Sequence, residues 1–217
     1  MSADIPEDQL QEITGRTLGH YQSSAYGFWV GTRDHDVSQN IDALLTHIEG
    51  TAPFKILDFG CGPGRDVMAF KQLGHEPVGL DGAAEFCAMA RRYTGCEVLH
   101  QDFLALDLSP QTFDGVFANA SLFHVPSQEL PRILVELNEA LKDGGVLFSS
   151  IPRGENTEGW NGERYGAYHD LESWRHYLTQ AGFVELVHYY RPPGLPRKQQ
   201  PWLASAWRKT DSSNEEH

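Results

Sequence analysis

The chain has 217 residues and a formal net charge of −13, with 17 lysines and arginines against 30 aspartates and glutamates. At this length, with 40% hydrophobic and 22% charged residues, we expect one globular domain. The acidic balance disfavours polyanionic partners, so neither nucleic acid nor a membrane surface is expected. The acidic N-terminus lacks the apolar core of a signal peptide, and no apolar run reaches the roughly 20 residues of a membrane span. Three cysteines without a C-x-x-C pair indicate reduced thiols, so we expect a cytoplasmic protein. We expect it to be a monomer or a homodimer.

The first 50 residues read as a mostly helical cap, with a helix predicted over 39–49. After a Gly-Thr-Ala-Pro turn, strands and helices alternate, which predicts an α/β fold with a mainly parallel sheet covered on both faces. The last two strands have no helix between them, so we expect them to pair antiparallel. The main functional domain is expected over 51–210, and the polar residues 211–217 are expected to be a disordered tail. The predicted strands are 54–59, 77–80, 97–100, 113–118, 146–151, 184–190 and 202–208, and the predicted helices are 66–73, 83–93, 127–141 and 170–181.

A glycine-rich loop follows the first strand in the sequence Leu57-Asp-Phe-Gly-Cys-Gly-Pro-Gly64. Its glycines allow the backbone to turn sharply and to approach a ligand in front of a helix N-terminus. The G-x-G-x-G spacing departs from the G-x-G-x-x-G fingerprint of dinucleotide-binding loops. Asp58 would also repel a pyrophosphate, so the loop suits a ligand that carries an ammonium group.

Two further acids follow the next two strands. Asp81 lies where an acidic residue accepts hydrogen bonds from ribose hydroxyls, and Asp102 can accept from an exocyclic amine such as that of adenine. Each acid alone could be a helix cap or a turn residue. At the carboxyl ends of consecutive parallel strands, however, they outline a site for an amino acid–ribose–adenine ligand.

These motifs, together with Gln101-Asp-Phe103, Phe113–Asn119 and Leu141-Lys-Asp-Gly-Gly145, resemble the class I S-adenosylmethionine-dependent methyltransferases. The likeness covers about residues 54–150 and is strongest to the small-molecule enzymes related to ubiquinone and menaquinone biosynthesis. It implies S-adenosylmethionine as cofactor and a Rossmann-like, seven-stranded sheet with an antiparallel last strand. The cofactor-binding residues that it implies are Asp58, Gly60, Gly62, Gly64, Asp81, Gly82, Asp102, Phe103, Asn119 and Ala120, with Tyr26 and Arg33 from the N-terminal segment.

Methyl transfer from a sulfonium depends mainly on proximity and orientation, and it needs a general base only when the acceptor carries a proton of high pKa. His124, just after the fourth strand, is the candidate base, and Tyr21 is a second catalytic candidate. A histidine there could equally cap the next helix or pack against the cofactor.

The segment 153–169 is expected to be a long loop that acts as a lid or a binding loop, because loops of this length are seldom filler. The aromatic stretch 21–36 is expected to close the site or to pack against the sheet edge. No metal is expected, since His35 and Asp36 have no third ligand at a helical spacing. The candidate substrate contacts are Trp29, Arg153, Trp160, Tyr165, Tyr168 and His169.

The leading hypothesis is methyl transfer to the nitrogen, oxygen or sulfur of a small molecule. Residues 151–209 carry eight basic and six acidic residues, which favours a small anionic or zwitterionic acceptor. Three alternatives stay open: methylation of a protein side chain, a nicotinamide-dependent oxidoreductase, and a catalytically silent subunit with the S-adenosylmethionine fold.

Overall fold

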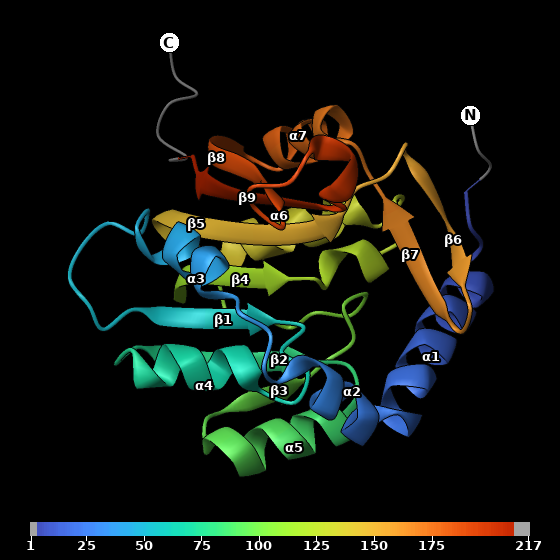
Figure 1. The fold of residues 1–217 in the computed structure, drawn as a ribbon, viewed down its shortest axis with the longest axis horizontal. Coiled ribbons are helices and arrows are strands. Elements are labelled where there is room, and N and C mark those ends of the chain that lie inside the picture. The colour runs from blue at the N-terminus through green and yellow to red at the C-terminus, as the bar shows by residue number, and fades with distance from the viewer. Residues whose placement is uncertain (1–3, 211–217) are drawn as a thin grey trace.

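A twisted seven-stranded sheet forms the centre of the computed structural model, which describes residues 4–210 (Figure 1). The strand order is β3-β2-β1-β4-β5-β9-β8. Strand β9 runs antiparallel to both of its neighbours, and every other pairing in the sheet is parallel. The predicted mostly parallel sheet with an antiparallel last strand is confirmed. The strands are β1 (Lys55–Phe59), β2 (Glu76–Asp81), β3 (Val98–His100), β4 (Phe113–Asn119), β5 (Leu141–Pro152), β8 (Phe183–Arg191) and β9 (Trp202–Lys209).

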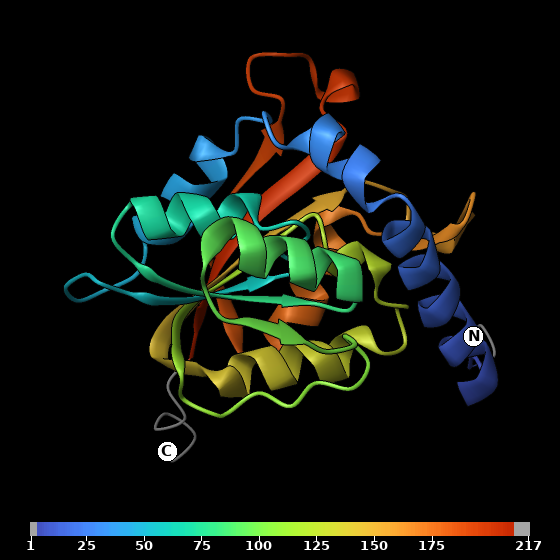
Figure 2. The same cartoon turned by 90° about the horizontal axis from the view of Figure 1, so that it is seen from below.

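Helices cover both faces of the sheet, as Figure 2 shows. One face carries α3 (Ser38–Leu45), α4 (Arg65–Gln72) and α5 (Ala84–Thr94), and the other carries α6 (Leu130–Ala140) and α7 (Leu171–Gln180). Apolar side chains of successive strand residues point to opposite faces, so β1 contributes Leu57 and Phe59 to one core and Ile56 to the other. The helices packed on both faces of the sheet therefore fix the positions of the strand ends, including the carboxyl ends of the parallel strands.

Two helices were predicted with different ends. Helix α3 stops at Leu45 instead of residue 49. Just after its end, the Thr46 N–H donates to the Asp42 carbonyl and the His47 N–H donates to the Leu44 carbonyl. Helix α6 begins at Leu130 instead of residue 127, with Pro131 in its first turn, where a missing N–H is tolerated.

The predicted loop over 153–169 is wrong, because most of it is a β-hairpin. Strands β6 (Thr157–Asn161) and β7 (Arg164–Tyr168) pair antiparallel around a two-residue turn in which Gly162 has a φ of +63°. A favoured two-residue turn has glycine with positive φ at its first central position, and Gly162-Glu163 is such a hairpin signal that the prediction overlooked.

The hairpin lies beside α1 (Glu7–Ser23), about 150 residues away in sequence (Figure 1). The backbone N–H of Tyr165 donates to Thr17 Oγ1 at 3.0 Å, and Arg16 Nε lies 2.7 Å from Glu163 Oε2. Helix α2 (Ala25–Thr32) continues from α1 toward the sheet edge. The predicted tail at 211–217 lies outside the described residues. Within residues 4–210, none of the helices has the length and apolar character needed to cross a membrane.

Candidate functional site

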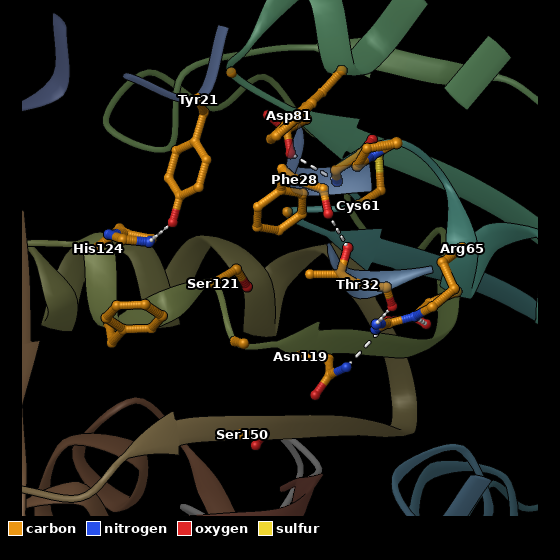
Figure 3. Close-up of a pocket in the computed structure, with 18 of the residues that line it drawn as sticks. Tyr21, Phe28, Thr32, Cys61, Arg65, Asp81, Asn119, Ser121, His124 and Ser150 are labelled. Carbon is orange, nitrogen blue, oxygen red and sulfur yellow. Dashed lines mark hydrogen bonds and ion pairs between the residues drawn. The ribbon is translucent and has the colours of Figure 1, made fainter. Parts of the chain in front are cut away.

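A cleft of about 590 Å³ opens at the carboxyl edge of the parallel strands. Its walls come from α1, α2, the loops after β1 to β4, the start of β9 and the end of β8. In Figure 3, Tyr21 and His124 face each other on one side of the cleft, while Asp81 and Cys61 lie at another. The volume lies in the range that small-molecule and cofactor sites occupy.

The glycine loop after β1 forms the cleft floor. Gly60 has a φ of +81°, and a side-chain carbon there would overlap the Ser121 side chain, so only glycine fits. Gly62 also has positive φ, and its N–H donates to Asp81 Oδ2 at 2.9 Å. The turn after β1 is thereby fastened to the end of β2.

Asp81 is buried at the bottom of the cleft, with 8% of its surface exposed. Its Oδ1 accepts a hydrogen bond from the Ala83 N–H at 2.8 Å. Burial raises the pKa of this carboxyl to about 6, while the N–H donors of Ala83 and Gly62 act in the opposite direction. Each carboxylate oxygen can accept a second hydrogen bond, so Asp81 keeps acceptor capacity toward the cleft.

Asp58 lies beneath the glycine loop, outside the lining of the cleft, with 2% of its surface exposed. Its Oδ2 has no hydrogen-bond partner among the described residues, and the buried Ser121 Oγ has none either. Burial first, and the nearby Asp66 second, raise the pKa of Asp58 well above its usual range. A buried carboxylate oxygen without a partner calls for an additional donor, and the ammonium group of an amino acid is a suitable one. These acceptor groups fit a methionine–ribose–adenine ligand.

His124 and Tyr21 form a directed hydrogen-bonded pair. The His124 Nδ1 lies 2.6 Å from the Tyr165 carbonyl oxygen, which can only accept, so Nδ1 carries the ring proton. The other nitrogen, Nε2, therefore accepts from the Tyr21 hydroxyl at 2.8 Å. Burial lowers the pKa of His124 to about 4, so the ring is neutral at physiological pH. Burial also raises the pKa of Tyr21, which keeps its hydroxyl protonated.

A second polar network crosses the cleft from α4 to α3. The Arg65 guanidinium donates through Nε and Nη2 to the two carboxylate oxygens of Asp66, at 2.6 and 2.8 Å. Asn119 Nδ2 donates to Asp66 Oδ2 at 3.1 Å, and Asn40 Nδ2 donates to Asn119 Oδ1 at 3.0 Å. The end of β4 is therefore held by side chains from two helices. Ala120, the next residue, has a φ of +63°, a conformation that a non-glycine residue adopts at some energetic cost.

The structure places eleven of the predicted site residues in the cleft lining. Nine others lie outside it. Tyr26 is 74% exposed beside a second, shallower hollow, and Arg33 lies 3.3 Å from Asp34 instead of facing the cleft. The lining residues are Tyr21, Trp29, Gly60, Gly62, Asp81, Gly82, Asp102, Phe103, Asn119, Ala120 and His124, and the residues outside are Tyr26, Arg33, Asp58, Gly64, Arg153, Trp160, Tyr165, Tyr168 and His169.

Several of the predicted site residues that lie outside the cleft lining contact other parts of the protein. Arg153 donates to the carbonyl oxygens of Arg197 and Gln200, both at 3.1 Å, and the Trp160 ring lies under the Arg16 guanidinium. Gly64 closes against α5, where a side-chain carbon would touch Ala90. These residues support the loops and helices around the cleft.

Sequence reasoning missed part of the lining. Arg65 directly follows the glycine loop and could have been included on that ground. The others come from segments far apart in the chain and carry no local motif that would reveal them. They include Asn40, Phe123, Arg164 and Trp202, whereas Phe28 belongs to the aromatic stretch 21–36 that was expected to close the site.

Residues 56–145 match the family model of a methyltransferase domain. The chain is 31% identical over 146 residues to a malonyl-[acyl-carrier protein] O-methyltransferase of Enterobacter lignolyticus, covering 66% of this chain and 53% of that protein. It is 30% identical over 155 residues to a trans-aconitate 2-methyltransferase of Rhodopseudomonas palustris, with coverage of 70% and 57%. The chain thus spans a little over half the length of these curated relatives.

Among solved structures, the chain resembles a Burkholderia thailandensis 1,6-didemethyltoxoflavin-N1-methyltransferase with bound 1,6-didemethyltoxoflavin and S-adenosylhomocysteine. The TM-score is 0.78 at 22% identity, and the match covers 96% of this chain and 94% of that one. A DhpI–S-adenosylhomocysteine complex gives a TM-score of 0.70 at 18% identity, with coverage of 92% and 98%. Both likenesses show a shared fold. None of these four comparisons supports an oxidoreductase or a silent subunit.

Proposed function

We propose that this chain belongs to the class I S-adenosylmethionine-dependent methyltransferases and that it transfers the methyl group of that cofactor to a small-molecule acceptor. The observation that carries the proposal is the glycine loop, Asp81 and Asp102 at the carboxyl ends of three adjacent parallel strands, all lining one cleft. The names of the relatives and the S-adenosylhomocysteine bound in similar structures support the same cofactor.

The chain's own residues suggest how the cofactor is held. We propose that Asp81 accepts from ribose hydroxyls and that Asp102 with Phe103 contacts adenine. The unpartnered oxygen of Asp58, buried beneath the glycine loop, would attract the amino group, directly or through water. When bound, S-adenosylmethionine supplies an electrophilic methyl group on a sulfonium. The protein then has to position the acceptor and exclude water.

We further propose that Tyr21 and His124 act together as the general base for an acceptor that carries a proton. The Tyr21 hydroxyl takes the acceptor's proton while it gives its own to His124 Nε2, which is free to receive it because the ring proton sits on Nδ1. The resulting imidazolium keeps its hydrogen bond to the Tyr165 carbonyl. The acceptor's freed electron pair would then bond to the methyl carbon, while the carbon–sulfur bond breaks and its electron pair stays on the sulfur of the departing S-adenosylhomocysteine. This arrangement suits a hydroxyl, amine or thiol acceptor.

A labelled-methyl assay tests the activity. Purified protein is incubated with methyl-labelled S-adenosylmethionine and a metabolite extract, and labelled products are identified by mass spectrometry. We expect a labelled small molecule with the wild-type chain and with the control Tyr93→Phe, whose ring lies outside the cleft. Binding of NADH without any binding of S-adenosylmethionine or S-adenosylhomocysteine would instead favour the oxidoreductase.

We also propose that the chain works in the cytoplasm as a monomer or homodimer. Its three cysteines are free, which suits a reducing compartment. Light scattering on the purified chain tests the oligomeric state.

A further inference from the structure

Charges on the cleft wall are arranged along the sheet. The acids Asp81 and Asp102 follow β2 and β3, near one end of the strand order. At the other end, Arg191 closes β8, the outermost strand, and Arg164 reaches the cleft from the hairpin strand β7. The half of the cleft near β2 and β3 therefore carries Asp81 and Asp102, and the opposite half carries Arg164 and Arg191, with Asp36 beside Arg191.

The two arginines differ from Arg65 in how much of their hydrogen-bonding capacity is already used. Arg65 commits its Nε and Nη2 to Asp66, and its Nη1 donates to the Thr32 carbonyl at 3.0 Å. Arg191 makes one such bond, from Nη2 to the Asp36 carbonyl at 3.0 Å. Arg164 makes one long contact, from Nη1 to the Tyr21 hydroxyl at 3.4 Å.

Within residues 4–210, neither Arg164 nor Arg191 lies within 4.0 Å of a carboxylate oxygen. A guanidinium has five N–H donors in a planar fork that matches a carboxylate. Most of that capacity remains available on both arginines. The cleft lining also includes Phe123 and Trp202, whose rings meet edge to face with centroids 6.4 Å apart.

We propose that the acceptor is a small organic acid whose carboxylate is bound by Arg164 and Arg191 while its apolar body lies against Phe123 and Trp202. The proposal rests on the proposed methyltransferase function and names its substrate class. The net charge of −13 repels anions at long range, so selection of an acid depends on these contacts inside the cleft.

The competing ligand for these arginines is the cofactor's own carboxylate. Position argues against it for Arg191, because β8 lies three strands beyond β4, which at about 4.8 Å per strand is roughly 14 Å. The glycine loop follows β1, one strand further away still. An acceptor placed beside the end of β4 lies between the cofactor and Arg191.

A binding experiment with matched probes tests the proposal. The probes are 3,4-dihydroxybenzoate and malonate, each paired with its neutral amide, titrated calorimetrically into protein saturated with S-adenosylhomocysteine. The variants are Arg164→Gln and Arg191→Gln, with Arg191→Lys keeping the charge but losing the planar fork. Arg92→Gln is the control, because Arg92 lies on α5 outside the cleft with its side chain 72% exposed. Methyl transfer to each probe is measured in parallel.

We expect at least one acid to bind about tenfold or more tightly than its amide, which is the scale of a charge-assisted hydrogen bond. Each glutamine variant should remove most of the preference for the acid and leave amide binding within about twofold. Arg191→Lys should keep part of the preference for the acid. The control Arg92→Gln should keep all of that preference. Equal binding of acids and amides, or no binding of either acid, overturns the proposal. So does a glutamine variant that weakens S-adenosylhomocysteine binding while the acid-to-amide ratio stays unchanged. Preferential acid binding without any methyl transfer would count against the proposed function alone.

Discussion

Asp81 is a buried carboxylate that fastens two turns and also lines the cleft. It accepts from the N–H groups of Gly62 and Ala83, so the loops after β1 and β2 share one anchor. We expect Asp81→Asn to weaken S-adenosylhomocysteine binding by about tenfold or more, because one acceptor oxygen becomes a donor. Calorimetry measures this, with Asp107→Asn as an exposed control outside the cleft.

The pH dependence of cofactor binding follows from the same group. The pKa of Asp81 is about 6, so the carboxylate is mostly ionised at pH 7.5 and mostly protonated at pH 5. Protonation removes an acceptor, so affinity should fall as the pH falls through about 6. An affinity that is constant from pH 5 to 7.5 would contradict the assigned role of Asp81.

Tyr21 and His124 are tested by separating turnover from binding. Tyr21→Phe removes the hydroxyl that donates to His124 Nε2, and we expect kcat to fall on the order of 100-fold or more while cofactor binding changes by less than about threefold. Tyr177→Phe is the control, because its ring lies outside the cleft. A kcat within twofold of wild type would remove Tyr21 from the mechanism.

The low pKa of His124 predicts a distinctive dependence of kcat on pH for the Tyr21–His124 pair. The base acts when neutral, and the pKa of His124 is about 4, so kcat at saturating cofactor should not decline near pH 6.5 as it would for an exposed histidine. We expect a flat kcat between pH 5.5 and 8. A fall in kcat with a pKa near 6.5 within that pH range would show that the His124 ring is solvated during turnover.

At the scale of elements, the hairpin β6–β7 and helix α1 form one side of the cleft together. Arg16 and Glu163 join them through two contacts, at 2.7 and 3.1 Å, on the exposed surface. We expect Glu163→Gln to leave the melting temperature nearly unchanged, because exposed ion pairs contribute little to stability. Local hydrogen exchange over residues 157–168 should nevertheless become faster.

Glu172→Gln provides the matched control for the hairpin. It removes a similarly exposed ion pair, with Arg175, on α7 outside the cleft. Exchange in the hairpin should stay at its wild-type rate in this variant. Equal exchange rates in the two variants would show that the Arg16–Glu163 pair does not hold the hairpin.

Elements with strong local signals were predictable from the sequence. The strand before Gly60 contains Ile56, Leu57 and Phe59 and is followed by glycines, and α6 repeats leucine and isoleucine at helical spacing. The hairpin was missed because β6 and β7 are polar and rich in glycine, so their alternation is hidden. The acids of the cofactor half each directly follow a predicted strand, whereas Arg164, Arg191 and Trp202 meet only through tertiary folding. No local pattern marks the acceptor half.

At the scale of the whole molecule, ligand binding should appear as added stability. S-adenosylhomocysteine at 100 times its Kd should add about 2.7 kcal/mol to the free energy of unfolding. For a chain of 217 residues this corresponds to a rise in melting temperature of roughly 5–10 °C. Differential scanning fluorimetry with NADH as the comparison ligand checks it. A rise with NADH and none with S-adenosylhomocysteine would contradict the assigned cofactor.

The position of β9 sets an order in which the molecule can be completed during synthesis. In the seven-stranded sheet β8 pairs with β9 alone, and β9 is made last. The strands that carry the glycine loop, Asp81 and Asp102 can assemble once residue 152 has left the ribosome, because β1 to β5 pair with one another. Arg191 and Trp202 reach their places only when residues 202–209 insert between β5 and β8. A nascent chain thus acquires the edge that is proposed to bind the nucleoside before it acquires the edge that is proposed to select an acceptor.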